Sequence, residues 1–182
     1  MLLTYQEAIN SSESERWKRA IEDEKMSLEK NQPWVYVDKK ETEANKILTG
    51  QWVFRIKANN KYKARLVIRG FEQEYGIDYT ETYSPVININ CLRILIALAA
   101  NKGYVIKSFD IKTAFLHGEL KEKIFMEVPE GYEQKDKVCL LKKALYGLKQ
   151  APLCWNTKFT NFLKSKGFNI IKAERCIFKN NT

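Results

Sequence analysis

Apolar residues recur at helical spacing in the first part of the chain. Between residues 14 and 30, one stripe consists of Trp17, Ile21 and Leu28, with Ala20 and Glu24 beside it. Charged residues fill the other faces, so the pattern predicts an amphipathic helix. Two S/T-x-x-E sequences that fit a capping box at a helix start lie in the same region: Thr4 with Glu7, and Ser12 with Glu15.

Strict alternation of apolar and polar residues then predicts a β-hairpin. Its strands are residues 51–58 and 62–69, joined by the short loop 59–61. One face of this ribbon is apolar, and the other carries Lys57, Lys63, Arg65 and Arg69. Such a face can bind phosphates through charge-assisted hydrogen bonds. An equally good interpretation is a solvated surface whose lysines prevent pairing with other strands.

The rest of the chain alternates between short strands and helices. Strands are predicted at 34–37, 123–128, 137–141 and 175–179, and an apolar helix at 90–101. A second helix begins at Pro152, with a predicted buried stripe of Trp155, Phe159, Phe162 and Leu163. Residues 70–85 and 142–152 are loops. The pattern therefore predicts an α/β protein, with Trp34, Trp52, Trp155 and Phe159 in its core.

One carboxylate follows an apolar run directly. Residues 104–109 contain Tyr104, Val105, Ile106 and Phe109, and predict a buried strand that ends at Asp110. A carboxylate at the end of a strand can be a ligand for a hard divalent cation. It can also be an ordinary turn or helix cap, which is the commoner role.

Charge is distributed unevenly along the chain. The formal net charge is +9, with 8 Lys/Arg and 10 Asp/Glu in residues 1–50 but 23 and 12 in residues 51–182. A basic body of this kind favours a polyanionic partner, although a merely basic surface has the same composition. The four widely spaced cysteines and single histidine argue against a zinc site and a disulfide framework, and favour a reducing, intracellular compartment. We find neither a membrane-spanning run nor a signal peptide.

Several blocks in order resemble one known family. These blocks are WVFRIK, YKARLVIRGFEQEYGIDYTETYSPV, SFDIKTAFLHGELKEKIFMEVPEG and VCLLKKALYGLKQAPLCW. Together they resemble the reverse transcriptase of copia-type LTR retrotransposon Pol polyproteins, and the likeness runs over nearly the whole chain. The resemblance implies a right-hand polymerase, with fingers from about 32–90 and 117–150 and a partial palm from about 91–116 and 151–182. Residues 1–31 would be an N-terminal helical extension.

The resemblance also implies roles for particular residues. Asp110 matches the first catalytic aspartate, and Ile111 would add a backbone carbonyl to one of two Mg²⁺ ions. Lys57 and Arg65 match residues that bind the incoming dNTP, and Phe115 matches the steric gate against ribonucleotides. Four residues match a loop that contacts the primer–template: Tyr146, Gly147, Lys149 and Pro152.

A departure from the family pattern limits the implied activity. In the family, two further catalytic aspartates form a Tyr-x-Asp-Asp turn, and no Asp-Asp pair occurs in this sequence. The resemblance therefore implies an N-terminal fragment truncated before that hairpin, which is catalytically incomplete and does not hold Mg²⁺ stably by itself. Its implied partners are an RNA or DNA primer–template, dNTP and the rest of the Pol polyprotein, in a cytoplasmic virus-like particle or the nucleus. The alternative is a non-catalytic nucleic-acid-binding remnant or host-adopted module.

Overall fold

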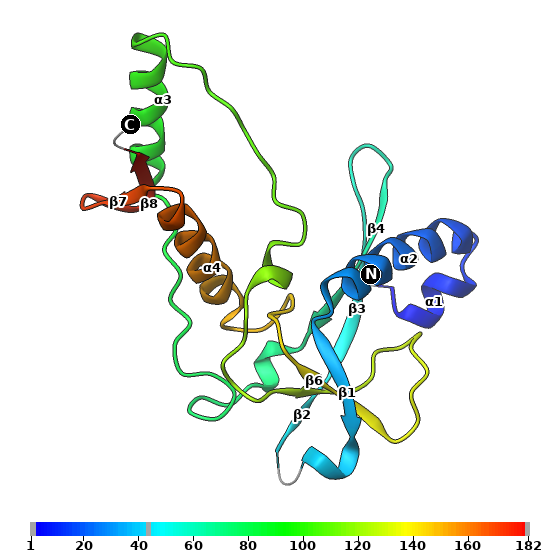
Figure 1. Cartoon of the computed structure of the whole chain (residues 1–182). Coiled ribbons are helices and arrows are strands. Elements are labelled where there is room, and N and C mark those ends of the chain that lie inside the picture. The colour runs from blue at the N-terminus through cyan, green and yellow to red at the C-terminus, as the bar shows by residue number, and fades with distance from the viewer. Residues whose placement is uncertain (1–2, 43–44, 181–182) are drawn as a thin grey trace.

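The computed structural model describes residues 3–42 and 45–180, and confirms a mixed α/β protein (Figure 1). Its α-helices are α1 (Tyr5–Asn10), α2 (Ser14–Asn31), α3 (Ile89–Asn101) and α4 (Ala151–Ser165). The first strands are β1 (Trp34–Asp38), β2 (Ile47–Leu48), β3 (Gly50–Ile56) and β4 (Tyr62–Ile68). The others are β5 (Phe125–Met126), β6 (Lys137–Leu141), β7 (Phe168–Ile171) and β8 (Glu174–Asn180). Short 3-10 helices are η1 (Lys39–Thr42), η2 (Gly70–Glu72) and η3 (Ala114–His117).

One of the two predicted capping boxes starts a helix. The Thr4 side chain accepts a hydrogen bond from the Glu7 N–H, and the Glu7 carboxylate accepts one from the Thr4 N–H at 2.7 Å. The prediction for Ser12 is wrong, because Glu13 precedes α2 and makes no side-chain cap. The Ser14 N–H instead bonds to the Ser11 carbonyl, so a turn separates α1 from α2.

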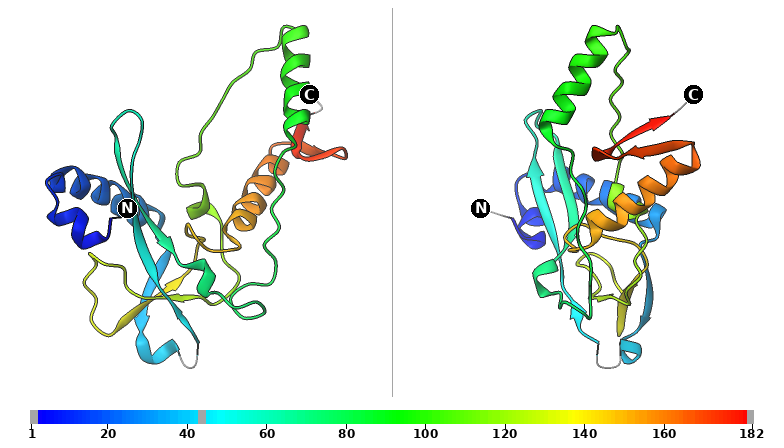
Figure 2. Two further views of the ribbon diagram at one scale, coloured as in Figure 1. Left: turned by 180° about the vertical axis from the view of Figure 1, so that it is seen from behind. Right: turned by 90° about the vertical axis from the view of Figure 1, so that its left-hand side faces the viewer.

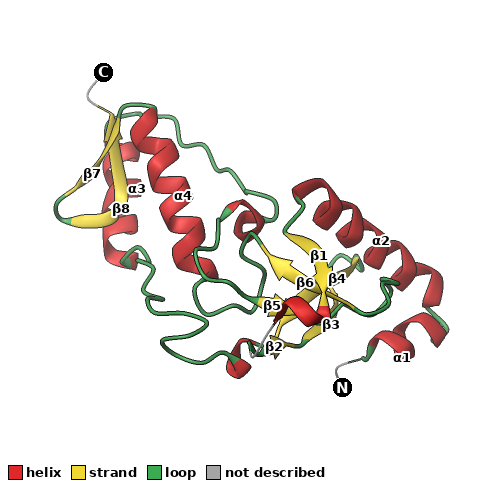
Figure 3. Cartoon of the chain, turned by 60° about the horizontal axis from the view of Figure 1, so that its bottom comes forward, coloured by secondary structure: helices red, strands yellow, loops and turns green. Residues whose placement is uncertain are grey.

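The β3–β4 hairpin forms as the alternation predicts. Its antiparallel register pairs Trp52 with Leu66 and Arg55 with Lys63, which puts the apolar side chains on one face. A second sheet has the strand order β1-β6-β5-β2, and β7 and β8 form a separate hairpin. Figure 3 shows β1–β6 grouped beside α1 and α2, with β7 and β8 at the opposite end of the molecule.

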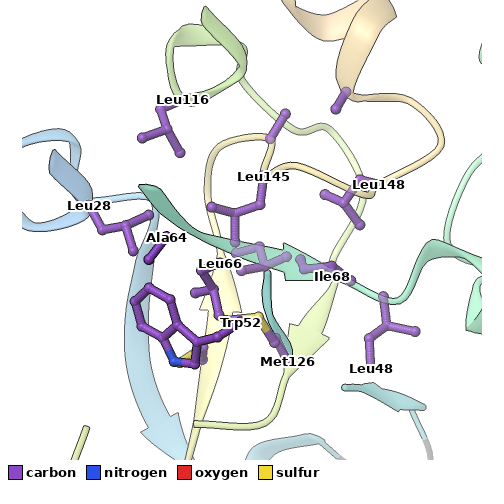
Figure 4. Packing of buried hydrophobic residues seen from close by; sticks show 14 of the residues in the cluster. Leu28, Leu48, Trp52, Ala64, Leu66, Ile68, Leu116, Met126, Leu145 and Leu148 are labelled. Carbon is purple, nitrogen blue, oxygen red and sulfur yellow. The ribbon is translucent and has the colours of Figure 1, made fainter. Parts of the chain in front are cut away.

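A single hydrophobic cluster joins the hairpin, α2 and the sheet. Its buried side chains include Leu28 of α2, Trp52 and Leu66 of the hairpin, and Met126 of β5 (Figure 4). Trp17 makes edge-to-face contacts with Phe54 at 5.2 Å and with Tyr62 at 4.4 Å between ring centroids. The predicted stripe of α2 is therefore confirmed, and the first two helices share the core of the hairpin.

The predicted buried strand at residues 104–109 is wrong. These residues have no regular secondary structure and return from the far end of α3 toward the core (Figure 2). Val105 is 83% exposed and Phe109 is 84% exposed. Among the described strands, none pairs with this segment. An apolar run becomes a strand only if another strand satisfies its backbone N–H and C=O groups, and the sequence pattern does not reveal whether one is available.

The C-terminal half is less buried than its pattern predicts. The helix α3 forms, but none of its residues is buried. In α4 only Ala151 is buried, so the predicted buried stripe is wrong: Trp155 and Phe159 are half-buried, and Phe162 is 55% exposed. The strand predicted at 123–128 is confined to β5, and β7 was not predicted. Over the described ranges, no helix combines the length and the apolar character needed to cross a membrane.

Candidate functional site

One cavity of about 450 Å³ is lined by residues from four segments of the chain: α2, the β3–β4 hairpin, the segment after α3 and the loop before α4. The hairpin contributes Lys57 and Arg65, the segment after α3 contributes Asp110 and Ile111, and the loop before α4 contributes Tyr146. Arg65 points away from the core because its neighbours in β4, Ala64 and Leu66, are buried. The structure thus brings five of the sequence-predicted site residues together, although the strand expected to carry Asp110 does not form.

Basic side chains also surround a second hollow on the hairpin, of about 600 Å³. Its polar lining includes Arg55, Lys57, Lys63 and Arg65. Burial lowers the pKa of Lys63, and the neighbouring charges of Arg65 and Lys57 lower this pKa further. Arg69 lies outside both cavities and donates a hydrogen bond from Nε to the Gln51 Oε1 at 3.3 Å. Crowded like charges favour an anion between them, so this surface can bind phosphate groups.

The Tyr146 ring connects the basic residues to the predicted steric gate. The Arg65 guanidinium lies over this ring, 4.7 Å from its centroid. The Phe115 ring contacts the Tyr146 ring edge to face, with 4.9 Å between the ring centroids. Phe115 is half-buried at the start of η3 and packs against the core, so it lies beside the cavity without lining it. The arrangement makes an aromatic wall next to a cation cluster.

Gly147 is required by a close approach of two backbones. The Ile68 N–H donates to the Tyr146 carbonyl at 2.8 Å, which ties the loop to the edge of β4. Gly147 has φ +94°, and a Cβ placed on it would lie 2.0 Å from the Ile68 carbonyl oxygen. Gly147 is therefore needed for contact with the chain's own strand, and its predicted contact with a primer–template stays a prediction.

The last two predicted residues lie outside the cavity. The Lys149 Nζ donates to the Gln73 carbonyl at 3.2 Å and to the Tyr79 hydroxyl at 3.1 Å. The buried Gln150 donates to the Asp78 carbonyl at 2.8 Å and accepts from the Gln73 Nε2 at 3.0 Å. Together these bonds fasten the loop to residues 73–79. Pro152 is exposed in the first turn of α4, where its carbonyl accepts a hydrogen bond from Ser84 at 3.2 Å.

The helix α2 supplies site residues that the sequence analysis missed. Asp23, Glu24 and Ser27 line the same cavity as Lys57 and Asp110. Glu24 is only 8% exposed, and its burial raises its pKa, while the Leu66 backbone and the charges of Lys63 and Arg65 act in the opposite direction. The sequence did contain a signal for Glu24: its carboxylate lies at helical spacing beside the apolar stripe of Trp17, Ile21 and Leu28, where a charged residue is unusual.

The raised pKa of Glu24 predicts a pH dependence of stability. The folded state favours the protonated carboxyl, so this group contributes stability below about pH 4.5, its ordinary pKa, and that contribution is lost as pH rises through the folded-state pKa. Urea unfolding midpoints measured from pH 4 to 8 should therefore fall more steeply in the wild type than in Glu24→Gln. Identical pH profiles for the two proteins would contradict the expectation.

The described residues do not assemble a complete metal site. No group of three or more His, Cys, Asp or Glu residues within residues 3–42 and 45–180 could hold a metal ion. Asp110 is exposed and offers one carboxylate, whereas Mg²⁺ and Ca²⁺ need several oxygen ligands. Thr113, three residues further on, has φ +52°, which is unusual for a β-branched residue.

Comparison with known proteins identifies the class of protein. The chain belongs to the reverse transcriptase (RNA-dependent DNA polymerase) family, which matches residues 31–182. It is 40% identical over 180 residues to the retrovirus-related Pol polyprotein from transposon TNT 1-94 of Nicotiana tabacum, covering 94% of this chain. It is also 39% identical over 169 residues to the transposon RE1 polyprotein of Arabidopsis thaliana, covering 88% of this chain. The resemblance to copia-type Pol polyproteins is confirmed.

The similarity extends to yeast but covers a small part of each relative. The chain is 31% identical over 191 residues to the transposon Ty1-ER2 Gag-Pol polyprotein of Saccharomyces cerevisiae, covering 98% of this chain. The matched region makes up 13%, 12% and 11% of the TNT 1-94, RE1 and Ty1-ER2 polyproteins. No solved structure matches the chain. The chain therefore spans only about an eighth of the length of these relatives.

Proposed function

We propose that this chain supplies the nucleotide-binding part of an RNA-directed DNA polymerase. Lys57 and Arg65 bind the triphosphate of the incoming dNTP, and Asp110 lines the same cavity. In the reaction, a primer 3′-hydroxyl attacks the α-phosphate and pyrophosphate leaves. One observation carries the proposal: Asp110 lines a single cavity with Lys57 and Arg65 although it lies far from them in the sequence.

The neighbouring aromatic residues support the same assignment. Phe115 lies against Tyr146, and Tyr146 lies under Arg65, so an aromatic wall adjoins the proposed triphosphate site. A ring in this place can crowd the 2′ position of the sugar and so exclude ribonucleotides. Ile111 follows Asp110 in the sequence and lines the same cavity, and in this proposal its backbone carbonyl serves as a metal ligand.

We also infer the layout of a right-hand polymerase from the family. The fingers comprise about 32–90 and 117–150, and the palm includes about 91–116 and 151–182. Residues 1–31 precede this domain as a helical extension. Tyr146, Gly147, Lys149 and Pro152 lie on the side of a primer–template, and two Mg²⁺ ions complete the site together with ligands from the rest of the polyprotein. A virus-like particle or the nucleus would be the place of action.

Binding of inorganic tripolyphosphate tests the proposed triphosphate site. We expect Lys57→Met and Arg65→Met each to weaken binding about tenfold in isothermal titration calorimetry, because each removes a charge-assisted hydrogen bond worth about 1.5 kcal/mol or more. The matched control is Lys40→Met, which removes an exposed cation from η1, outside the cavity. Equal affinities for all four proteins would rule out this site.

A non-catalytic nucleic-acid-binding module is the second candidate function. It is favoured by the excess of basic residues after residue 50, where 23 Lys/Arg face 12 Asp/Glu. Such a module would bind a primer–template through its phosphates, with an affinity that falls steeply as salt rises. The two candidates differ in one respect, because only a polymerase needs the carboxylate of Asp110.

A further inference from the structure

A buried carboxylate lies among the cations of the proposed triphosphate site. Glu24 is 8% exposed, and it lines the same cavity as Lys57, Lys63 and Arg65. It lies on α2, at a position before the family match at residues 31–182. Glu24 takes part in none of the ion pairs among the described residues. Those ion pairs join exposed or half-exposed side chains elsewhere in the molecule. A buried charge without a direct ionic partner is costly and calls for an explanation.

The outer edge of β4 affects the charge of this carboxylate. In an antiparallel hairpin, alternate residues point their N–H groups toward the partner strand or away from it. The Ile68 N–H points away from β3 and binds the Tyr146 carbonyl. The Leu66 N–H, two residues earlier, lies on the same outer edge and favours the charged form of Glu24. Glu24 and the Tyr146 carbonyl therefore occupy neighbouring positions along one strand edge.

The charges around Glu24 are mostly positive and repel one another. Lys63 is half-buried, and the charges of Arg65 and Lys57 lower its pKa, whereas the charge of Glu24 raises it. A carboxylate in this position partly neutralises the cation cluster while no ligand is bound. An incoming polyphosphate brings several negative charges to the same cations and is repelled by Glu24.

We propose that Glu24 is an internal counter-anion of the triphosphate site, which partly neutralises Lys63 and Arg65 and thereby limits their affinity for polyphosphate. This role rests on the proposed function of the cavity. In this role, α2 contributes a side chain that affects ligand binding, in addition to packing against the hairpin. The role also favours a polyphosphate that carries its own cation over a free one, because a bound cation reduces the repulsion from Glu24.

Substitution of Glu24 by glutamine tests the role. Glu24→Gln keeps the size of the side chain and one polar oxygen, but removes the charge. We expect tripolyphosphate to bind about three- to tenfold more tightly at low ionic strength, because one like charge near the ligand is gone. The Tm should be no lower than in the wild type, since burial favours the neutral form of this side chain. Glu22→Gln makes the same change on an exposed face of α2, and we expect it to alter neither quantity.

A second measurement judges the role without any ligand. The pKa of Lys63, followed by NMR on ¹³C-methylated lysines and assigned with Lys63→Arg, should fall in Glu24→Gln and stay unchanged in Glu22→Gln. A wild-type protein that binds no tripolyphosphate would overturn the proposed function, while the Lys63 titration would still decide whether Glu24 neutralises this cation. An unchanged Lys63 pKa, or tripolyphosphate binding that is unchanged or weaker in Glu24→Gln, would overturn the counter-anion role. A merely structural role would lower the Tm without tightening binding.

Discussion

Asparagine in place of Asp110 should abolish primer extension by a polymerase that contains this segment. The test enzyme is a chimera in which this chain replaces the 40% identical region of the TNT 1-94 polyprotein. Asn keeps the size of the side chain but has no charge to offer a hard divalent cation. Because such charge stabilisation is worth several kcal/mol in a transition state, we expect a loss of about 10³-fold or more in the rate of dNTP incorporation.

Asp136→Asn is the matched control for this substitution. Asp136 lies in the turn before β6 with φ +55°, a backbone conformation that Asn tolerates well, and it lines neither cavity. The control chimera should extend primers at the rate of the unsubstituted chimera. Primer extension that survives Asp110→Asn would exclude the catalytic assignment. An unsubstituted chimera that folds but extends no primer would count against the polymerase function as a whole.

The sequence identified Asp110 as a candidate residue, but only the structure shows what surrounds it. The residue type and its neighbours identified Asp110 as a candidate, and the structure shows that it lines the same cavity as Lys57 and Arg65. The supporting strand was predicted incorrectly, because residues 104–109 have an apolar pattern but no described strand partner. Local pattern predicts which residues prefer to be buried, whereas burial itself depends on what other segments supply.

The N-terminal half was predicted more fully because its partners are close in the sequence. The apolar face of the hairpin and the stripe of α2 pack on each other, so both patterns find their expected burial. By contrast, α3 has the same apolar character with no buried residue, and Phe162 of α4 is largely exposed. Large exposed apolar surfaces usually mark interfaces. In the TNT 1-94 polyprotein, the region that matches this chain makes up only 13% of the length.

Side-chain networks account for what the sequence could not reveal. Nothing in the spacing of Gln73 and Gln150 predicts that their amides meet at 3.0 Å in the interior. Likewise, the sequence shows that Glu24 lies beside the predicted helical stripe. Only the fold shows that Glu24 lines the same cavity as Lys63 and Arg65. Contacts of this kind depend on how distant segments pack, which periodicity does not encode.

Alanine at Gly147 should be among the most destabilising single substitutions in this chain. At φ +94°, the added Cβ would lie 2.0 Å from the Ile68 carbonyl oxygen and 2.8 Å from a Val67 methyl group. The loop would have to leave the edge of β4 and lose the bond between the Ile68 N–H and the Tyr146 carbonyl. Left-handed strain, steric overlap and a lost hydrogen bond together should lower the free energy of unfolding by about 3–5 kcal/mol, as measured by urea denaturation.

Gly76→Ala separates the backbone strain from the overlap. Gly76 has φ +84°, but a Cβ there would meet no atom within 4 Å, so the cost should be only about 1 kcal/mol. Because Tyr146 also holds Arg65 and Phe115, the Gly147 variant should bind tripolyphosphate more weakly even where it remains folded, whereas the Gly76 variant should bind normally. Equal destabilisation by the two substitutions would mean that the loop does not press against β4, and the aromatic wall would then lose its structural basis.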